Sequence, residues 1–414
     1  MEVCDFIINS FQDLISKEPT VCEEEEEDEV SVCYPTFDQQ IIFDLLALTI
    51  DKLKTGKALI EISHPITIVG DLHGNLADLI KILHIFGTPP SKKYIFLGDF
   101  VDRGKYSLAV ISLILAYMLK YEDCVYVIRG NHEFMHINRA YGFFDEIMAT
   151  YRNEEMWIKF QEVFSWFPLA ATISQAVFCV HGGLSPLLQD LDTLRELPMP
   201  IPNYLTNSMI SDLVWSDPVD TVKGFQLNHR GSGQIFGPDV VEQFLRNNKL
   251  KLMVRGHQCT LSGFRAFADF MGITVFSSSN YCSAIQNKCG VVTLNSERTI
   301  SFFSIEIESD YGCLPRAVMS LPVDGDVGLK RIFRTISRPD FRQVVQVQQT
   351  ESPLAQNDSN TEENGGSSPQ QTTITTKIST ATVATSSTSI STLNNEESHF
   401  PRSMSVIENL TGVS

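Results

Sequence analysis

The chain has 414 residues and a formal net charge of −18, from 50 acidic and 32 basic residues. Hydrophobic residues make up 43% of the sequence, enough for the core of one large or two ordinary domains. The acidic balance argues against a protein that binds nucleic acid or anionic membranes along its whole length, because both need positive charge.

Targeting and cysteine patterns also narrow the class of protein. No basic stretch precedes the first apolar residues, so a secretory signal is not predicted. The longest apolar run, residues 108–119, is shorter than the roughly 20 residues of a membrane span and is interpreted as a buried helix. The nine cysteines form no CxxC pair, which favours reduced thiols. We therefore expect a cytoplasmic or nuclear protein without membrane or nucleic-acid partners.

Composition divides the chain into three regions. Residues 1–36 form an N-terminal segment with seven consecutive acids at 23–29, a run of the kind that is usually solvated and disordered. Residues 37–310 have the apolar pattern of one globular catalytic domain. Residues 311–414 form a C-terminal extension, and most of it is a Ser/Thr-rich tail that cannot bury enough apolar surface to offset its chain entropy.

Within residues 37–310, hydrophobic periodicity predicts strands that alternate with helices. Strands are expected at residues 66–69, 94–97, 125–128, 177–180, 250–254, 273–276, 291–294 and 299–307. Helices are expected at residues 76–86, 107–121 and, for the most part, 143–164. The early alternation predicts βαβ units, and the strand-rich end predicts an added antiparallel part. The expected fold class is therefore α/β, with an α+β element.

Polar residues cluster where five of the predicted strands end. The five ends read Asp71-Leu-His73-Gly-Asn75, Asp99-Phe-Val-Asp102-Arg103-Gly104, Arg129-Gly-Asn131-His132-Glu133, His181-Gly-Gly183 and Arg255-Gly-His257. In α/β sheets, ligands bind at the carboxyl ends of strands, and glycine lets the backbone turn sharply beside a ligand. The sequence therefore predicts that these five ends converge on one site.

Six of these side chains are metal ligands of a coherent chemical type: Asp71, His73, Asp99, Asn131, His181 and His257. Carboxylates, an amide oxygen and imidazoles, without thiolate, suit Mn, Fe or Zn. Six protein ligands are too many for one catalytic ion with an open position, and they fit two divalent ions that share one carboxylate. A single Asp-x-His is weak evidence, and it is the occurrence of all five motifs in one order that supports the prediction.

Neighbouring residues add the chemistry of phosphoryl transfer. Arg103 and Arg230 can donate paired hydrogen bonds to phosphate oxygens. His132 could protonate a leaving oxygen, and Asp102 could hold its imidazole. Two ions about 3.5–4 Å apart can clamp an in-line displacement at phosphorus and ionise a bound water near neutral pH.

These motifs resemble those of the PPP serine/threonine protein phosphatases, and the similarity to the type-1 catalytic subunit extends from about residue 6 to residue 307. The resemblance implies a central β-sandwich flanked by helices, with a dinuclear metal site at the carboxyl ends of strands. It implies a metal-dependent serine/threonine phosphoprotein phosphatase in which metal-bound hydroxide attacks in line and His132 is the general acid. Phosphoproteins are the implied substrates, regulatory subunits are further candidate partners, and Mn is the metal expected in recombinant material.

The resemblance also assigns individual roles. By motif, Asp71 and His73 resemble ligands of the first ion, Asp99 the bridging ligand, and Asn131, His181 and His257 ligands of the second. His132 resembles the general acid and Asp102 its partner. Substrate contacts are implied for Arg103, Asn131, Arg230 and Tyr281. Asp217 resembles an acid beside the site, and Cys282 resembles the thiol that some phosphatase toxins reach.

The sequence departs from the family pattern at several positions, and the loop around Asn280 is one of them. Ser278-Ser279 precede Asn280 where the family has Ala-Pro, and residues 283–287 lack the acids that usually follow. We therefore expect an altered substrate groove and altered inhibitor sensitivity. Two alternatives stay open: another metallophosphoesterase that acts on nucleotides or phosphodiesters, and a binding module that has lost catalysis.

Overall fold

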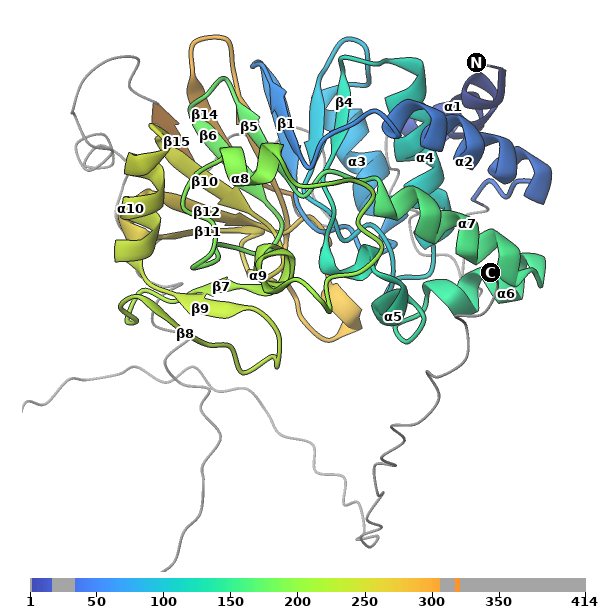
Figure 1. The fold of residues 1–414 in the computed structure, drawn as a ribbon. Coiled ribbons are helices and arrows are strands. Elements are labelled where there is room, and N and C mark those ends of the chain that lie inside the picture. Colours follow the sequence, from blue (N-terminus) through green and yellow to red (C-terminus); the bar gives the residue numbers. More distant parts are fainter. Residues whose placement is uncertain (1, 17–33, 306–316, 321–414) are drawn as a thin grey trace, which may run out of the picture. The chain divides into compact units, whose positions relative to one another are not determined.

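The computed structural model describes residues 2–16, 34–305 and 317–320 (Figure 1). The acidic run at 23–29, nearly all of the predicted C-terminal extension and its Ser/Thr-rich tail lie outside these residues. The fold is a sandwich of two six-stranded sheets with helices on both outer faces, as the resemblance predicts.

Each sheet mixes parallel and antiparallel pairs. The first sheet has the order β1 (Leu59–Ile62), β5 (Ala170–Ile173), β6 (Val177–Val180), β10 (Leu252–Arg255), β12 (Gly272–Val275) and β11 (Phe264–Phe267). The second has the order β15 (Ala317–Ser320), β14 (Thr299–Ile305), β13 (Cys289–Leu294), β2 (Ile66–Val69), β3 (Tyr94–Phe96) and β4 (Val125–Val127). A small third sheet contains β7 (Asp217–Pro218), β9 (Gln234–Phe236) and β8 (Phe225–Leu227).

Side chains along β2 alternate between two hydrophobic layers, one on each side of this strand. Successive side chains of a strand point to opposite faces of the sheet. Ile66 and Ile68 belong to the cluster between the two sheets, whereas Val69 belongs to the cluster under the helices. A strand buried on both faces therefore reads as a continuous apolar run, Ile-Thr-Ile-Val.

Helices cover both outer faces. The second sheet is covered by α1 (Glu2–Ser16), α2 (Gln39–Leu53), α3 (Leu76–Phe86), α4 (Ser107–Lys120), α6 (Phe143–Tyr151) and α7 (Glu154–Ser165). The first sheet is covered by α8 (Asp192–Arg195), α9 (Ser208–Trp215) and α10 (Pro238–Asn247), and the short α5 (Met135–Asn138) follows β4. Twelve residues of α4, from Ser107 to Met118, are buried, which confirms the buried helix predicted at 108–119. In the described part of the chain, no helix has the length and hydropathy of a membrane span.

Most predicted elements are present, and the differences have local causes. The predicted helix at 143–164 is two helices, because Arg152 adopts the left-handed conformation (φ +52°) and Asn153 caps α7 by accepting the Glu155 N–H. The boundary predicted at residue 36 left α1 outside the catalytic domain. In the structure, α1 packs on α4, and its Ile7 and Phe11 are fully buried in the core beneath the second sheet. An amphipathic helix from outside the predicted domain thus completes its core.

Candidate metal centre

The five polar strand ends converge at one edge of the sandwich. In the second sheet β2, β3 and β4 are mutually parallel, and in the first sheet β6 and β10 are parallel, so each group presents its carboxyl ends together. Hydrogen bonds join the two groups, because the His257 N–H donates to Asp71 Oδ1 over 2.8 Å. The predicted convergence of residues from distant parts of the chain is confirmed.

Asp99 lies between two sets of ligand atoms. One set contains His73, Asp99 and His132, and the other contains Asp99, His181 and His257, with all ligand atoms of a set within 4.8 Å of one another. Asp99 Oδ2 is 3.5 Å from His73 Nε2 and 3.3 Å from His181 Nε2. Asp99 is the residue that the two sets share, which is the position a bridging carboxylate would occupy.

Asn131 completes the second set. Its Oδ1 lies 2.9 Å from His181 Nε2 and 2.8 Å from His257 Nδ1. Ligands about 2.1 Å from a shared ion lie roughly 3 Å apart when they occupy neighbouring corners of its coordination shell. The spacing of these three atoms therefore fits a common ion.

The tautomer of His181 gives a direct test of whether an ion fits. Its Nδ1 lies 2.8 Å from the carbonyl oxygen of Leu97, which only accepts, so Nδ1 carries a proton. In neutral His181, Nε2 then carries a lone pair and no proton. It nevertheless faces two oxygen atoms that also carry lone pairs, Asn131 Oδ1 and Asp99 Oδ2. Lone pairs that face one another repel unless a proton or a metal ion lies between them. His73 is arranged in the same way, with its Nδ1 3.0 Å from the carbonyl oxygen of Val101. The residues present fit divalent ions.

Electrostatics supports the same conclusion. Burial disfavours a charged imidazole, but the carboxylates of Asp99, Asp71 and Glu133 together outweigh it and raise the pKa of His181 to about 9. Burial also raises the pKa of Asp71 to about 7. Without ions the site would therefore hold protons near neutral pH, and metal binding would release them, because metal ligands must be deprotonated.

The backbone at the site is strained in a way that the sequence does not reveal. Three of the predicted ligands, His73, Asp99 and His257, have positive φ angles of 46°, 52° and 70°. Non-glycine residues adopt this region at a cost and only where the surrounding structure holds them there. Gly130 permits the close approach, since a Cβ there would lie 2.2 Å from Asp99 Oδ1.

His132, predicted as the general acid, lies close enough to His73 and Asp99 to belong to the first set, but its ring is held by Asp102. Its Nδ1 is 2.6 Å from Asp102 Oδ2, and Asp102 Oδ1 accepts the Phe143 N–H over 2.9 Å. Although burial disfavours its charged form, the carboxylates of Asp99 and Asp102 raise the pKa of His132. Because Nδ1 is engaged, Nε2 is the atom that remains to exchange a proton.

The two arginines occupy different surroundings. Arg103 is exposed, and its guanidinium carbon lies 4.2 Å from the ring centre of Tyr141. Arg230 follows β8 and donates from Nε to Asp217 Oδ2 over 2.6 Å. Asp217 also pairs with the buried Arg255 over 3.3 Å and lies 4.0 Å from His257 Nε2. Asp217 thus connects Arg230 to the metal-ligand cluster.

Comparisons with known proteins bear on this geometry. A family model for calcineurin-like phosphoesterases matches residues 64–261, a range that contains all six predicted metal ligands. The chain contains a calcineurin-like phosphoesterase domain.

Solved structures add a second comparison for the phosphoesterase domain. A serine/threonine phosphatase of Saccharomyces cerevisiae with similarity to human phosphatase PP5 is 26% identical, with a TM-score of 0.62, over 66% of this chain and 92% of its own. A cold-active protein tyrosine phosphatase of a Shewanella species is 12% identical, with a TM-score of 0.43, over 69% of this chain and 86% of its own. The predicted resemblance to the PPP phosphatases is confirmed.

Glu133 is a residue of the phosphoesterase domain whose role the sequence did not reveal. Its two carboxylate oxygens accept the N–H groups of Asp99, Phe100 and Gly130 over 2.8–2.9 Å. A fully buried carboxylate thus joins the loop that carries Asp99 to the loop that carries Asn131. The only signal in the sequence was its place at the end of the Gly-Asn-His-Glu motif.

Tyr281 and the loop that departs from the family pattern border the metal centre of the phosphoesterase domain. The Tyr281 ring lies 5.1 Å from the His73 ring, centre to centre. The buried side chain of Asn287 holds this loop by accepting the Tyr281 N–H over 2.9 Å and donating to the Ser278 carbonyl over 2.7 Å. Cys282 of the same loop is exposed.

Proposed function

We propose that this chain is a metal-dependent serine/threonine phosphoprotein phosphatase that hydrolyses phosphomonoesters. The observation that carries the proposal is the position of Asp99, which is shared by two sets of ligand atoms, one of which also contains His132, the partner of Asp102. Two divalent ions, of Mn, Fe or Zn, would be held by the six predicted ligands, with Asp99 common to both.

The residues around the ions have separate tasks. When bound, two divalent ions neutralise phosphoryl oxygens and supply a water that is ionised near neutral pH. Arg103, Arg230 and the Asn131 amide hold the phosphoryl oxygens. His132 donates the proton from Nε2 to the serine or threonine oxygen as it leaves, and Asp102 keeps the ring oriented through Nδ1.

The similarity to the yeast enzyme supports the substrate class. That protein is named a serine/threonine phosphatase, and the aligned region covers 92% of it. Nearly the whole of that protein therefore shares the fold of this chain. We extend the proposal to phosphoserine and phosphothreonine proteins as substrates and to regulatory subunits as partners.

The test compares substrates on one metal-loaded preparation. A phosphoserine peptide, a phosphothreonine peptide, a phosphotyrosine peptide and bis-p-nitrophenyl phosphate are assayed side by side, with elemental analysis of the same sample. We expect turnover of the first two, loss of turnover after chelation, and recovery when Mn²⁺ is returned. Preferred turnover of the phosphodiester would instead assign the domain to another metallophosphoesterase activity.

A binding module without catalysis is the remaining alternative. It predicts no metal-dependent turnover of any of these substrates, although the fold is intact. The complete ligand set and the His132–Asp102 pair support an enzyme, because both belong to chemistry that simple binding does not need.

A further inference from the structure

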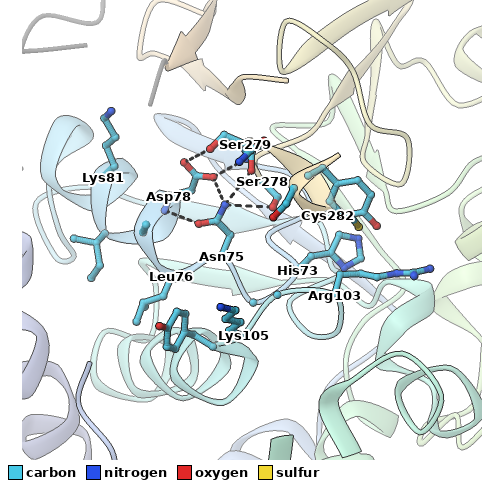
Figure 2. A pocket seen from close by; sticks show the side chains of 18 of the residues that line it. His73, Asn75, Leu76, Asp78, Lys81, Arg103, Lys105, Ser278, Ser279 and Cys282 are labelled. Carbon is cyan, nitrogen blue, oxygen red and sulfur yellow. Dashed lines mark hydrogen bonds between the residues drawn. The ribbon is translucent and has the colours of Figure 1, made fainter. Parts of the chain in front are cut away.

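A groove of about 770 Å³ opens from the metal centre. It begins at His73 and Arg103. Its walls are formed by Asn75, by one face of α3 from Leu76 to Lys81, and by the loop at 278–283. Figure 2 shows Arg103 beside His73, with Lys105 below them and Lys81 at the far side of the view. If a phosphorylated residue of a peptide is bound at the metal centre, the peptide residues on either side of it would lie along this groove.

Basic side chains dominate the charge of this groove. Arg103, Lys105 and Lys81 line it, and Arg103 and Lys105 are exposed to solvent. Arg103 stacks on Tyr141 and, like Lys105, forms no ion pair with another residue of the described ranges. The positive charge of these two side chains is therefore available to a ligand.

Among the residues that the structure describes, one acidic residue lines the groove, and it is already engaged. Asp78 is 6% exposed and accepts the Ser279 N–H over 2.6 Å, the Ser279 hydroxyl over 3.1 Å and the Asn75 amide over 2.6 Å (Figure 2). Burial raises its pKa to about 6. Asp78 thus fastens the 278–283 loop to α3, and its buried carboxylate is engaged by these three donors.

We propose that this groove binds acidic side chains close to the phosphorylated residue, so that the preferred substrates are acidic phosphopeptides. The inference rests on the proposed phosphatase function and names its substrate class. An extended peptide advances about 3.3 Å per residue, so positions two to four from the phosphoserine reach beyond Arg103 toward Lys105 and Lys81. Coulomb attraction between exposed charges is modest, and it selects among substrates mainly through kcat/KM.

The experiment measures kcat/KM for matched phosphoserine peptides with neutral flanks, with three acids before the phosphoserine, with three acids after it, and with three basic residues on each side. For the wild-type chain we expect one acidic peptide to exceed the neutral peptide by roughly threefold to tenfold, the range that one to three exposed charge pairs supply. The preference should decline as NaCl is raised, because exposed charges are screened.

Charge variants locate the effect. Lys105→Glu should remove the acidic preference and Lys105→Gln should reduce it. Lys251→Glu is the matched control, since Lys251 is exposed just before β10 and His257 follows the other end of this strand, whose four residues span about 13 Å; its replacement should leave the preference intact. The readout is a ratio of two substrates on one preparation, so partial loss of folded enzyme does not alter it.

The acidic run of this chain, residues 23–29, could compete with acidic peptides for the groove, and the experiment therefore includes a variant without it. Residues 23–29 end five positions before Tyr34, which lines the groove. The peptides are therefore also compared on a chain in which this run is replaced by Gly and Ser, where we expect an equal or larger preference.

The inference and the proposed function fail in different ways. If all four phosphoserine peptides are hydrolysed equally by both chains, or if Lys251→Glu abolishes the preference as fully as Lys105→Glu, the groove proposal is overturned and the phosphatase remains. If no phosphoserine peptide is hydrolysed by the metal-loaded chain, the proposed function itself is wrong.

Discussion

Glu133 offers the sharpest test of how the metal centre is held. The perturbation is Glu133→Gln, which keeps the size of the side chain and removes one acceptor. In the best orientation, the amide oxygen replaces Oε2 and keeps the N–H groups of Asp99 and Gly130. The amide nitrogen then replaces Oε1 and faces the Phe100 N–H at 2.8 Å, donor against donor.

The magnitude follows from these bonds. One hydrogen bond to a charged acceptor is lost, which costs about 1.5–3 kcal/mol, and two buried donors are left opposed. The two hydrogen bonds that remain become weaker, because their acceptor is no longer charged. In the opposite direction, the variant avoids the free-energy cost of burying an ionised group. We expect a net loss of about 2–4 kcal/mol in the free energy of unfolding. Because Glu133 positions Asp99, metal affinity should also fall by roughly 10- to 100-fold.

The assay is urea unfolding of the metal-free chain, followed by tryptophan fluorescence, with metal titration of the folded chain alongside. Burial raises the pKa of Glu133 to about 7, so pH 8 keeps the wild-type carboxylate ionised. Glu162→Gln is the control, because Glu162 is exposed and pairs only with Lys159, and its loss should lie within about 0.5 kcal/mol. Equal stability and equal metal affinity of wild type and Glu133→Gln at pH 8 would refute this account of the site.

Three further predictions concern the ligands, the acid and a buried carboxylate. Asp99→Ala should weaken both ions, so elemental analysis should find far fewer than two ions per chain, and unchanged content would exclude the bridging role. His132→Asn should lower kcat for a phosphoserine peptide by roughly 10²- to 10⁴-fold with metal content retained, and near-normal turnover would exclude it as the acid. Burial raises the pKa of Glu146, which accepts the N–H groups of Ser107 and Leu108 at the start of α4, from 4.5 to about 7. Between these pH values the folded chain retains a proton that the unfolded chain has lost. The stability of the wild type relative to Glu146→Gln should therefore fall by on the order of 2 kcal/mol as pH rises from 4.5 to 7, and then level off; a difference in unfolding free energy that is independent of pH would contradict this.

The sequence predicted those features that depend on neighbours along the chain. The strand at 66–69 and the helix at 76–86 have the structural bounds of β2 and α3, because their periodicities belong to local backbone geometry. The six candidate ligands were recognisable because each stands within four residues of the end of a strand and beside a glycine. Once the strands are parallel, local position alone brings such residues to one edge.

The tertiary structure decided what depends on distant residues. Which imidazole faces which oxygen, and the positive φ of His73, Asp99 and His257, follow from contacts such as the His257 N–H to Asp71 bond, 186 residues apart in the chain. The contacts of α1 with α4 and the bond between Asp78 and Ser279, which are 201 residues apart, have the same origin. No periodicity encodes them, because they form only when the chain closes and buries these groups together. The sequence by itself therefore determined the chemistry of the site, and the fold determined its geometry and the basic groove beside it.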